Sequence, residues 1–148
     1  IRDRDNITDS SEIEQKHILT FYCGGGKYAF DIMSVRDIIE IPPITRLPLT
    51  ADYIEGVINL RGKVIPVMNF NKRLGLSEGV YTDKSCVIVV ESNGSPYGVI
   101  VERTGDASVY SSVQFAPSPV ENSFISGYIV QDAERIPLID SVRLAENE

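Results

Sequence analysis

Two apolar runs that meet at a short polar turn form the most regular pattern in the chain, between residues 54 and 70. Along the first run Val57, Asn59 and Arg61 share one face, with apolar residues on the other, which is the period of two of a β-strand. The turn consists of three residues, Arg61, Gly62 and Lys63. This pattern predicts a β-hairpin with one face in a core and with Asn59 and Arg61 together at its tip.

Short apolar runs separated by turn-forming residues continue through the chain, and each predicts a strand. These runs are His17–Cys23, Lys27–Ile32, Ser85–Glu91, Tyr97–Val101, Ala107–Val113, Phe124–Val130 and Ile136–Ile139. Asn93-Gly94 is the strongest turn signal, and Gly105 interrupts the pattern before Ala107. Because helices do not alternate with strands, we expect an all-β sandwich or barrel and no parallel sheet.

One segment, residues 33–40, changes from strand to helical spacing. Three of its apolar residues lie at i, i+3 and i+4, namely Val35, Ile38 and Ile39. This spacing predicts a short helix with an apolar face that is either core or interface, and with Asp37 off that face, free to pair with Arg61 or with a partner. Pro42-Pro43 ends the helix. Two more helical segments are expected, at 71–76 and 141–145.

Composition limits the classes of partner. The 148 residues fit one domain of ordinary size, and 43% of them are hydrophobic, enough for a core. A net charge of −7 argues against nucleic acid and anionic membranes, which attract basic surfaces. No apolar run approaches the ~20 residues of a spanning helix, so membrane insertion is not expected. Residues 1–16 are largely polar and are expected to form a flexible tail.

Candidate catalytic groups are scarce. The one histidine, His17, lies too far along its strand to reach Cys23, and a hydrolase that uses Cys86 remains an alternative. We expect both cysteines to be reduced core thiols, as in a cytoplasmic protein, and we expect no metal or cofactor. Arg61 beside Asn59 is either a solvated tip or a docking anchor, because arginine is enriched at interface cores. An unrelated β-barrel that binds a ligand also remains open.

The segment Gly56-Val-Ile-Asn-Leu-Arg-Gly-Lys-Val-Ile-Pro-Val resembles the signature of CheW-like domains, the coupling proteins of bacterial chemotaxis. The resemblance extends from about Ile18 to Ile139. It includes Tyr28-Ala-Phe-Asp-Ile, Val35-Arg-Asp-Ile-Ile-Glu, Ile44-Thr-Arg-Leu-Pro, Val87-Ile-Val-Val, Tyr97-Gly-Val-Ile-Val and Ile136-Pro-Leu-Ile-Asp.

This resemblance implies two intertwined five-stranded SH3-like β-barrels with short helices, over residues 17–148, and an apolar groove between them. Residues from about 45 to 110 would form one barrel, and the N- and C-terminal segments the other. It also implies a non-enzymatic adaptor in the cytoplasm, without a cofactor. The implied partners are the regulatory domain of the histidine kinase CheA and the cytoplasmic tip of chemoreceptors, the methyl-accepting chemotaxis proteins.

The resemblance also implies a set of partner-binding residues in this chain. They lie at the hairpin tip and on the segment that resembles the family's receptor-binding helix: Asn59, Arg61, Gly62, Val35, Asp37 and Ile38. Because the sequence begins with Ile1 rather than Met, a CheW-like module of a CheV-type adaptor, or of the kinase's own regulatory domain, stays open as an alternative.

Overall fold

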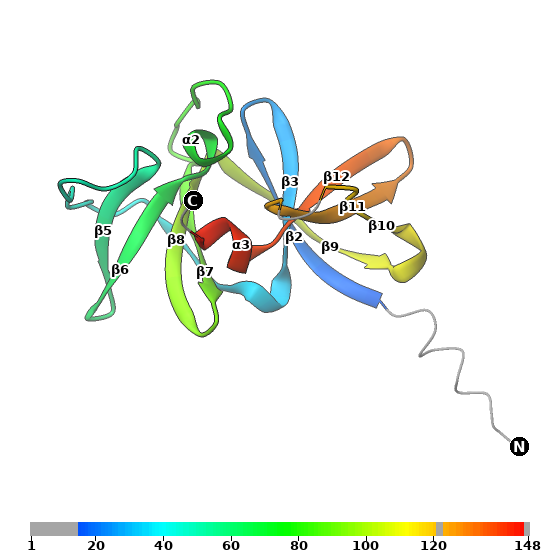
Figure 1. Ribbon diagram of the computed structural model, residues 1–148, viewed down its shortest axis with the longest axis horizontal. Coiled ribbons are helices and arrows are strands. Elements are labelled where there is room, and N and C mark those ends of the chain that lie inside the picture. Colours follow the sequence, from blue (N-terminus) through cyan, green and yellow to red (C-terminus); the bar gives the residue numbers. More distant parts are fainter. Residues whose placement is uncertain (1–14, 121–122, 147–148) are drawn as a thin grey trace, which may run out of the picture.

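The computed structural model describes residues 15–120 and 123–146, which form two β-sheets side by side (Figure 1). One sheet has six strands in the order β10-β11-β12-β3-β2-β9. Their bounds are β2 Gln15–Cys23, β3 Gly26–Asp31, β9 Arg103–Ser111, β10 Phe115–Pro117, β11 Ile125–Gln131 and β12 Glu134–Ile139. The predicted tail lies outside the described residues, apart from the last two positions of 1–16, which begin β2.

The second sheet has five strands in the order β4-β7-β8-β6-β5. Their bounds are β4 Val35–Glu40, β5 Ile54–Leu60, β6 Lys63–Asn69, β7 Cys86–Ser92 and β8 Ser95–Val101. Most strand pairs are antiparallel, so neither sheet is a parallel sheet, but each contains one parallel pair, β12 with β3 and β6 with β8. Both pairs join strands far apart in sequence, which local patterns do not report.

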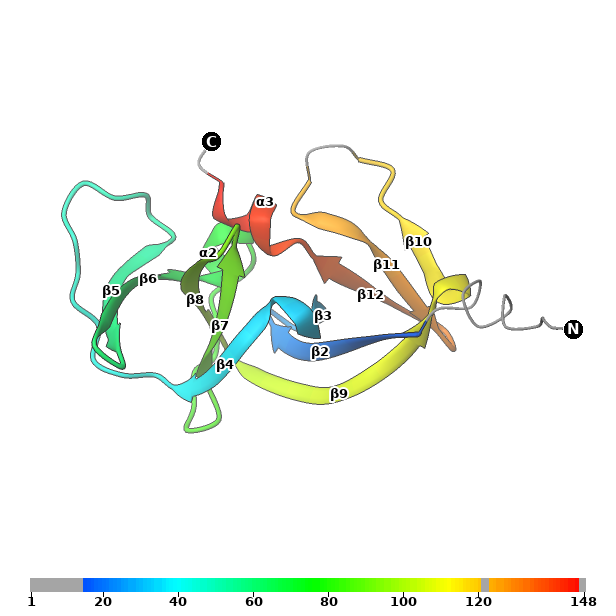
Figure 2. The same cartoon turned by 90° about the horizontal axis from the view of Figure 1, so that it is seen from below.

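The prediction of a mainly β, two-lobed architecture is confirmed, with three differences. One sheet has six strands rather than five, and no ladder among the described residues closes either sheet into a barrel. The strands of the five-stranded sheet span 35–101, whereas the expected division fell at about 45 and 110. Strands β4 and β9 cross between the two lobes in opposite directions (Figure 2), which intertwines them.

A shared core fills the space between the two sheets. Leu19, Phe21 and Phe30 enter it from the six-stranded sheet and are buried. Most of the buried residues of this core come from the five-stranded sheet and from the helix that follows β6. They are Met68, Phe70, Cys86, Ile88, Val90, Tyr97, Val99 and Val101. Phe21 stacks on Phe30 at 5.0 Å and meets Phe70 edge-on at 4.9 Å. Both are favourable aromatic geometries, so these rings tie the lobes together.

The predicted helix at 33–40 is wrong. The structure has a single 3₁₀ turn, η1 Ile32–Ser34, followed by strand β4. Burial along β4 alternates strictly, with Val35, Asp37 and Ile39 half-buried and the residues between them exposed. Spacings of three and four therefore coincided by chance with a strand of β-branched residues, and pairing with β7 decided the outcome.

The two other helical predictions are confirmed. Helix α2 spans Phe70–Leu74 and ends at Gly75, which has the left-handed φ of 69° that favours glycine at this position. Helix α3 spans Ser141–Ala145 and begins at Asp140, whose carboxylate accepts the N–H groups of Val142 and Arg143. Figure 1 shows α3 lying between the two lobes.

Strand β9 runs through Gly105, where the sequence pattern had predicted an interruption. A Cβ atom at Gly105 would lie 2.4 Å from Oγ1 of Thr20 on the neighbouring strand β2. The glycine therefore allows close approach inside the sheet instead of ending the strand.

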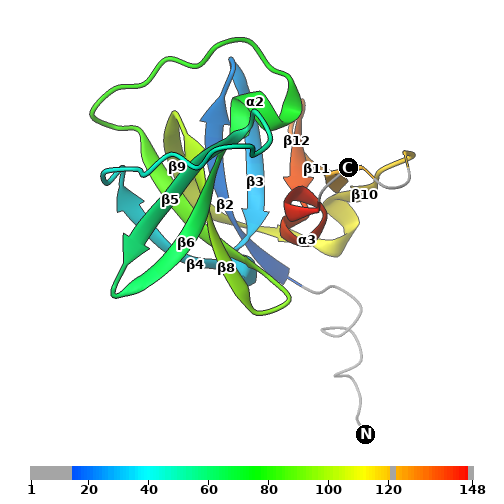
Figure 3. The ribbon, with the colours of Figure 1, turned by 60° about the vertical axis from the view of Figure 1, so that its left-hand side comes forward.

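The five-stranded sheet curls so that its two edges approach each other (Figure 3). The segment after β4 reaches β5 at one bridge, where Thr45 and Val57 exchange backbone hydrogen bonds of 2.9 and 2.8 Å. Gly56 sits beside this bridge at a register shift, with a φ of 145°. A Cβ atom there would lie 2.1 Å from the carbonyl oxygen of Thr45. The curl therefore depends on Gly56.

We expect Gly56→Ala to lower the free energy of unfolding by about 3 kcal/mol or more, because backbone strain and overlap with Thr45 add. The matched control is Gly25→Ala, since Gly25 also has a positive φ, 79°, but has open space around it. Gly25→Ala should lower the free energy of unfolding by only the ~1–3 kcal/mol that backbone strain costs. Urea unfolding measures both, and equal losses would show that the approach of Thr45 does not constrain the fold.

Candidate functional site

The tip of the β5–β6 hairpin is a two-residue turn, Arg61-Gly62, with φ angles of 52° and 81°. Lys63, which the sequence analysis placed in the turn, instead pairs with Leu60 as the first residue of β6. Two positive φ angles indicate a type I′ turn, which matches the twist of the strands. Asn59 holds the turn, because its Oδ1 accepts the N–H of Gly62 at 3.0 Å.

Arg61 meets Asp37 across the gap between the two edges of the five-stranded sheet. Its Nη2 lies 2.9 Å from Oδ2 of Asp37, so the pairing that the sequence analysis considered does form. Oδ2 is buried and accepts no well-aligned hydrogen bond, which makes the contact chiefly one between charges. The Arg61 side chain is 75% exposed, so the pair contributes little stability and leaves the arginine accessible.

A hollow of about 300 Å³ adjoins this ion pair. Three cationic residues line it, namely Arg36, Arg61 and Lys63, beside apolar residues such as Leu60 and Pro96. Arg36 also binds Glu91 on β7 at 2.7 Å, and this hydrogen bond lowers the pKa of the Glu91 carboxyl. On a chain with a net charge of −7, this is a local basic surface.

Val35 and Ile38 have different surroundings on β4. Val35 is half-buried and packs against the shared core, so it is a structural residue in the free protein. Ile38 is 44% exposed and is accessible to a partner. The structure thus brings Asn59, Arg61, Gly62 and Asp37 together, and places Ile38 outward on the strand that carries Asp37.

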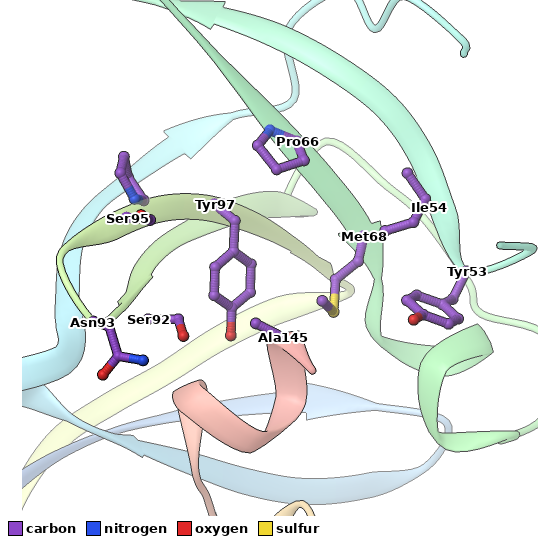
Figure 4. A pocket seen from close by; sticks show the side chains of 10 residues that line it. Tyr53, Ile54, Pro66, Met68, Ser92, Asn93, Ser95, Tyr97 and Ala145 are labelled. Atoms are coloured by element: carbon purple, nitrogen blue, oxygen red, sulfur yellow. The ribbon is translucent and has the colours of Figure 1, made fainter. Parts of the chain in front are cut away.

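A larger groove of about 460 Å³ begins next to the hollow, with Pro96 lining both. Met68 on β6 and Tyr97 on β8 point toward Ala145 of α3, while Tyr53 and Ile54 lie on the far side from Asn93 (Figure 4). The lining is largely apolar, so the groove suits a nonpolar segment of a partner. The sequence predicted none of these residues as a site residue. It placed Asn93 in a turn and Tyr97 at the start of a strand, without indicating that they line a groove.

The two cysteines are free, buried and unsuited to catalysis. Burial raises the pKa of the Cys23 thiol to about 12, and it also raises the pKa of Cys86. A thiol needs the opposite shift to act as a nucleophile, so the Cys86 hydrolase alternative fails. Within 15–120 and 123–146, no three histidine, cysteine, aspartate or glutamate residues group as metal ligands would. No helix in the same residues is long and apolar enough to cross a membrane.

Residues 17–148 match the family model of the CheW-like domain. The chain is 30% identical over 130 residues to the chemotaxis protein CheW of Rhizobium meliloti, with 84% of each chain covered. It is also 30% identical over 142 residues to CheW of Thermotoga maritima, covering 94% of this chain and 93% of that one. The crystal structure of the scaffolding protein TtCheW from Thermoanaerobacter tengcongensis superposes with a TM-score of 0.85 at 31% identity, over 90% of this chain and 94% of that chain.

The Arg36–Glu91 pair gives the stability of the protein a pH dependence. The pKa of Glu91 is lower in the folded state than its usual 4.5, so the pair stabilises the fold fully above that pH. This contribution is lost as the pH falls through the folded pKa. We therefore expect Glu91→Gln to lower the thermal midpoint at neutral pH and to have a shrinking effect below pH 4.5.

Thermal unfolding at a series of pH values measures this difference. The control repeats the comparison in an Arg36→Gln background, where Glu91 has lost its partner and Glu91→Gln should change little at any pH. A pH-dependent difference that persists in that background would assign the effect to another group.

Proposed function

Because the chain belongs to the CheW-like domain family, we propose that it is a chemotaxis adaptor that couples transmembrane chemoreceptors to the histidine kinase CheA in the cytoplasm. The adaptor role follows from the family, whose members are scaffolding proteins rather than enzymes. The two partners and their contact residues are the proposal.

The observation that carries the receptor contact is the apolar groove between the five-stranded sheet and α3, beside a basic hollow. The cytoplasmic tip of a chemoreceptor is a helical hairpin, and an amphipathic helix binds by placing its apolar face in such a groove. Met68, Tyr97 and Ile54 would contact that face. Acidic residues flanking it would meet Arg61 and Lys63, which line the adjoining hollow.

In this proposal each predicted site residue either contacts the partner or supports a residue that does. Arg61 contacts the receptor, with Asp37 restraining its direction through their ion pair. Asn59 and Gly62 hold the turn that presents Arg61. Ile38 adds exposed apolar area on the neighbouring strand. Val35 supports β4 from the core side.

We expect Arg61→Glu to weaken binding of a receptor-tip hairpin by at least about tenfold, or ~1.4 kcal/mol, because it replaces attraction to an acidic partner by repulsion. The thermal midpoint should fall by only a few degrees, since the side chain is 75% exposed. Arg135→Glu is the matched control, an exposed charge reversal on β12 of the other sheet.

The double variant Asp37→Arg with Arg61→Asp separates two explanations of such a loss. It restores an ion pair between the sheet edges but does not restore the arginine at the tip. Calorimetric binding that stays weak supports direct contact by Arg61. Recovered binding would show that only the ion pair matters. If the Arg61 variants lose binding to the kinase regulatory domain but keep binding to the receptor, the hairpin tip is the contact for the kinase instead.

A bulky residue in the groove should exclude the receptor helix. Ser95 is exposed on β8 and lines the groove, so we expect Ser95→Tyr to reduce receptor-tip affinity by about tenfold or more. Binding of the kinase regulatory domain should not change. Ser77→Tyr is the control, because Ser77 is also exposed but does not line the groove. Unchanged receptor binding by the Ser95 variant would place the receptor elsewhere.

A further inference from the structure

Arg73 is a buried arginine in the last turn of α2 that fixes the C-terminal end of α3. Only 8% of the residue is exposed. Its Nε donates to the carbonyl oxygen of Leu144 at 3.0 Å, and its Nη2 donates to that of Glu146 at 2.5 Å. A buried guanidinium is favourable only when its N–H groups find acceptors, and the end of a helix supplies free carbonyls.

The same guanidinium lies between two aromatic rings. Its central carbon is 4.4 Å from the centre of the Tyr53 ring and 4.2 Å from that of Phe124. Tyr53 directly precedes β5 in one sheet, whereas Phe124 lies just before β11 in the other. Arg73 therefore contacts segments of both lobes as well as α3.

These contacts hold two parts of the groove lining that come from different segments of the chain. Tyr53 lines one side, and Ala145, between the two residues whose carbonyls Arg73 binds, lines another (Figure 4). The other end of α3 is fixed separately, because the Tyr97 hydroxyl donates to the carbonyl oxygen of Ser141 at 2.6 Å. A five-residue helix is not stable alone, so its place depends on such contacts.

We propose that Arg73 is a positioning residue that sets the separation of Tyr53 and Ala145, and thereby fits the groove to its helix. This inference rests on the proposed function, since it concerns the groove assigned to the receptor. Arginine is required because its planar fork donates in two directions while its faces stack on rings. A lysine ammonium is a single point that cannot meet both carbonyls and both rings.

The test uses Arg73→Met, which keeps the volume but removes the donors, and Arg73→Lys, which keeps the charge. The matched control is Arg143→Met. Arg143 lies on α3 itself but is 41% exposed, and it binds Asp140 and the carbonyl oxygen of Ser123 rather than the groove walls. All three substitutions are made in the complete 148-residue sequence.

Two measurements on the free protein report the position of α3 without any partner. One is the resonance of the Ala145 methyl group in ¹³C-alanine-labelled protein, and the other is amide hydrogen exchange at Ala145 and Glu146. We expect both Arg73 variants to shift the methyl resonance and to speed exchange, with little change in Arg143→Met. These readouts keep their meaning even if the wild-type protein binds no receptor hairpin, which would defeat the proposed function alone.

Binding then shows whether this position matters. We expect receptor-tip affinity to fall about tenfold in both Arg73 variants, with the affinity for the CheA regulatory domain unchanged. Equal losses for both partners would make Arg73 a general stability residue and overturn the inference. So would an unmoved Ala145 resonance, or receptor binding at the wild-type level in Arg73→Met.

Discussion

The shared core between the two sheets is the constraint on which the other features depend. Phe21 and Phe30 reach it from one sheet and Phe70 from the base of the other, and their rings are in direct contact. Each lobe also buries a smaller cluster of its own, around Ile129 in the six-stranded sheet and around Val67 in the five-stranded sheet, but both lobes bury side chains in the shared core. The crossing strands β4 and β9 reinforce this dependence, since each begins beside one sheet and pairs in the other.

The surfaces that we propose for binding lie at the edges of the five-stranded sheet and beside the junction of the two lobes. Curling of the five-stranded sheet brings β4 to the tip of the β5–β6 hairpin, which is why Asp37 meets Arg61. The junction of the lobes is covered by α3, and the groove forms beside it. Its walls come from segments that are distant in sequence, so its shape depends on polar contacts such as those of Arg73 and Tyr97.

An adaptor needs a surface that is ready to bind but that does not react. The titratable groups of this chain fit that role, because the cysteines are buried and their pKa values are raised. The cationic side chains of the hollow are accessible, and those that pair do so with single carboxylates at its rim. Weak exposed pairs cost little to rearrange, so a partner can compete for them.

The sequence alone determined most local structure. Alternating apolar residues and turn dipeptides defined nearly every hairpin, and the two short helices α2 and α3 were predicted close to where they form. Asn59 and Arg61 were recognisable as an unusual polar edge. Tertiary structure decided the rest. Pairing with β7 made β4 a strand, and pairing with β2 on both sides of Gly105 kept β9 continuous. Three features join segments that are distant in sequence: the Asp37–Arg61 ion pair, the groove and the contacts of Arg73. No local pattern encodes the distance between segments that meet only after folding.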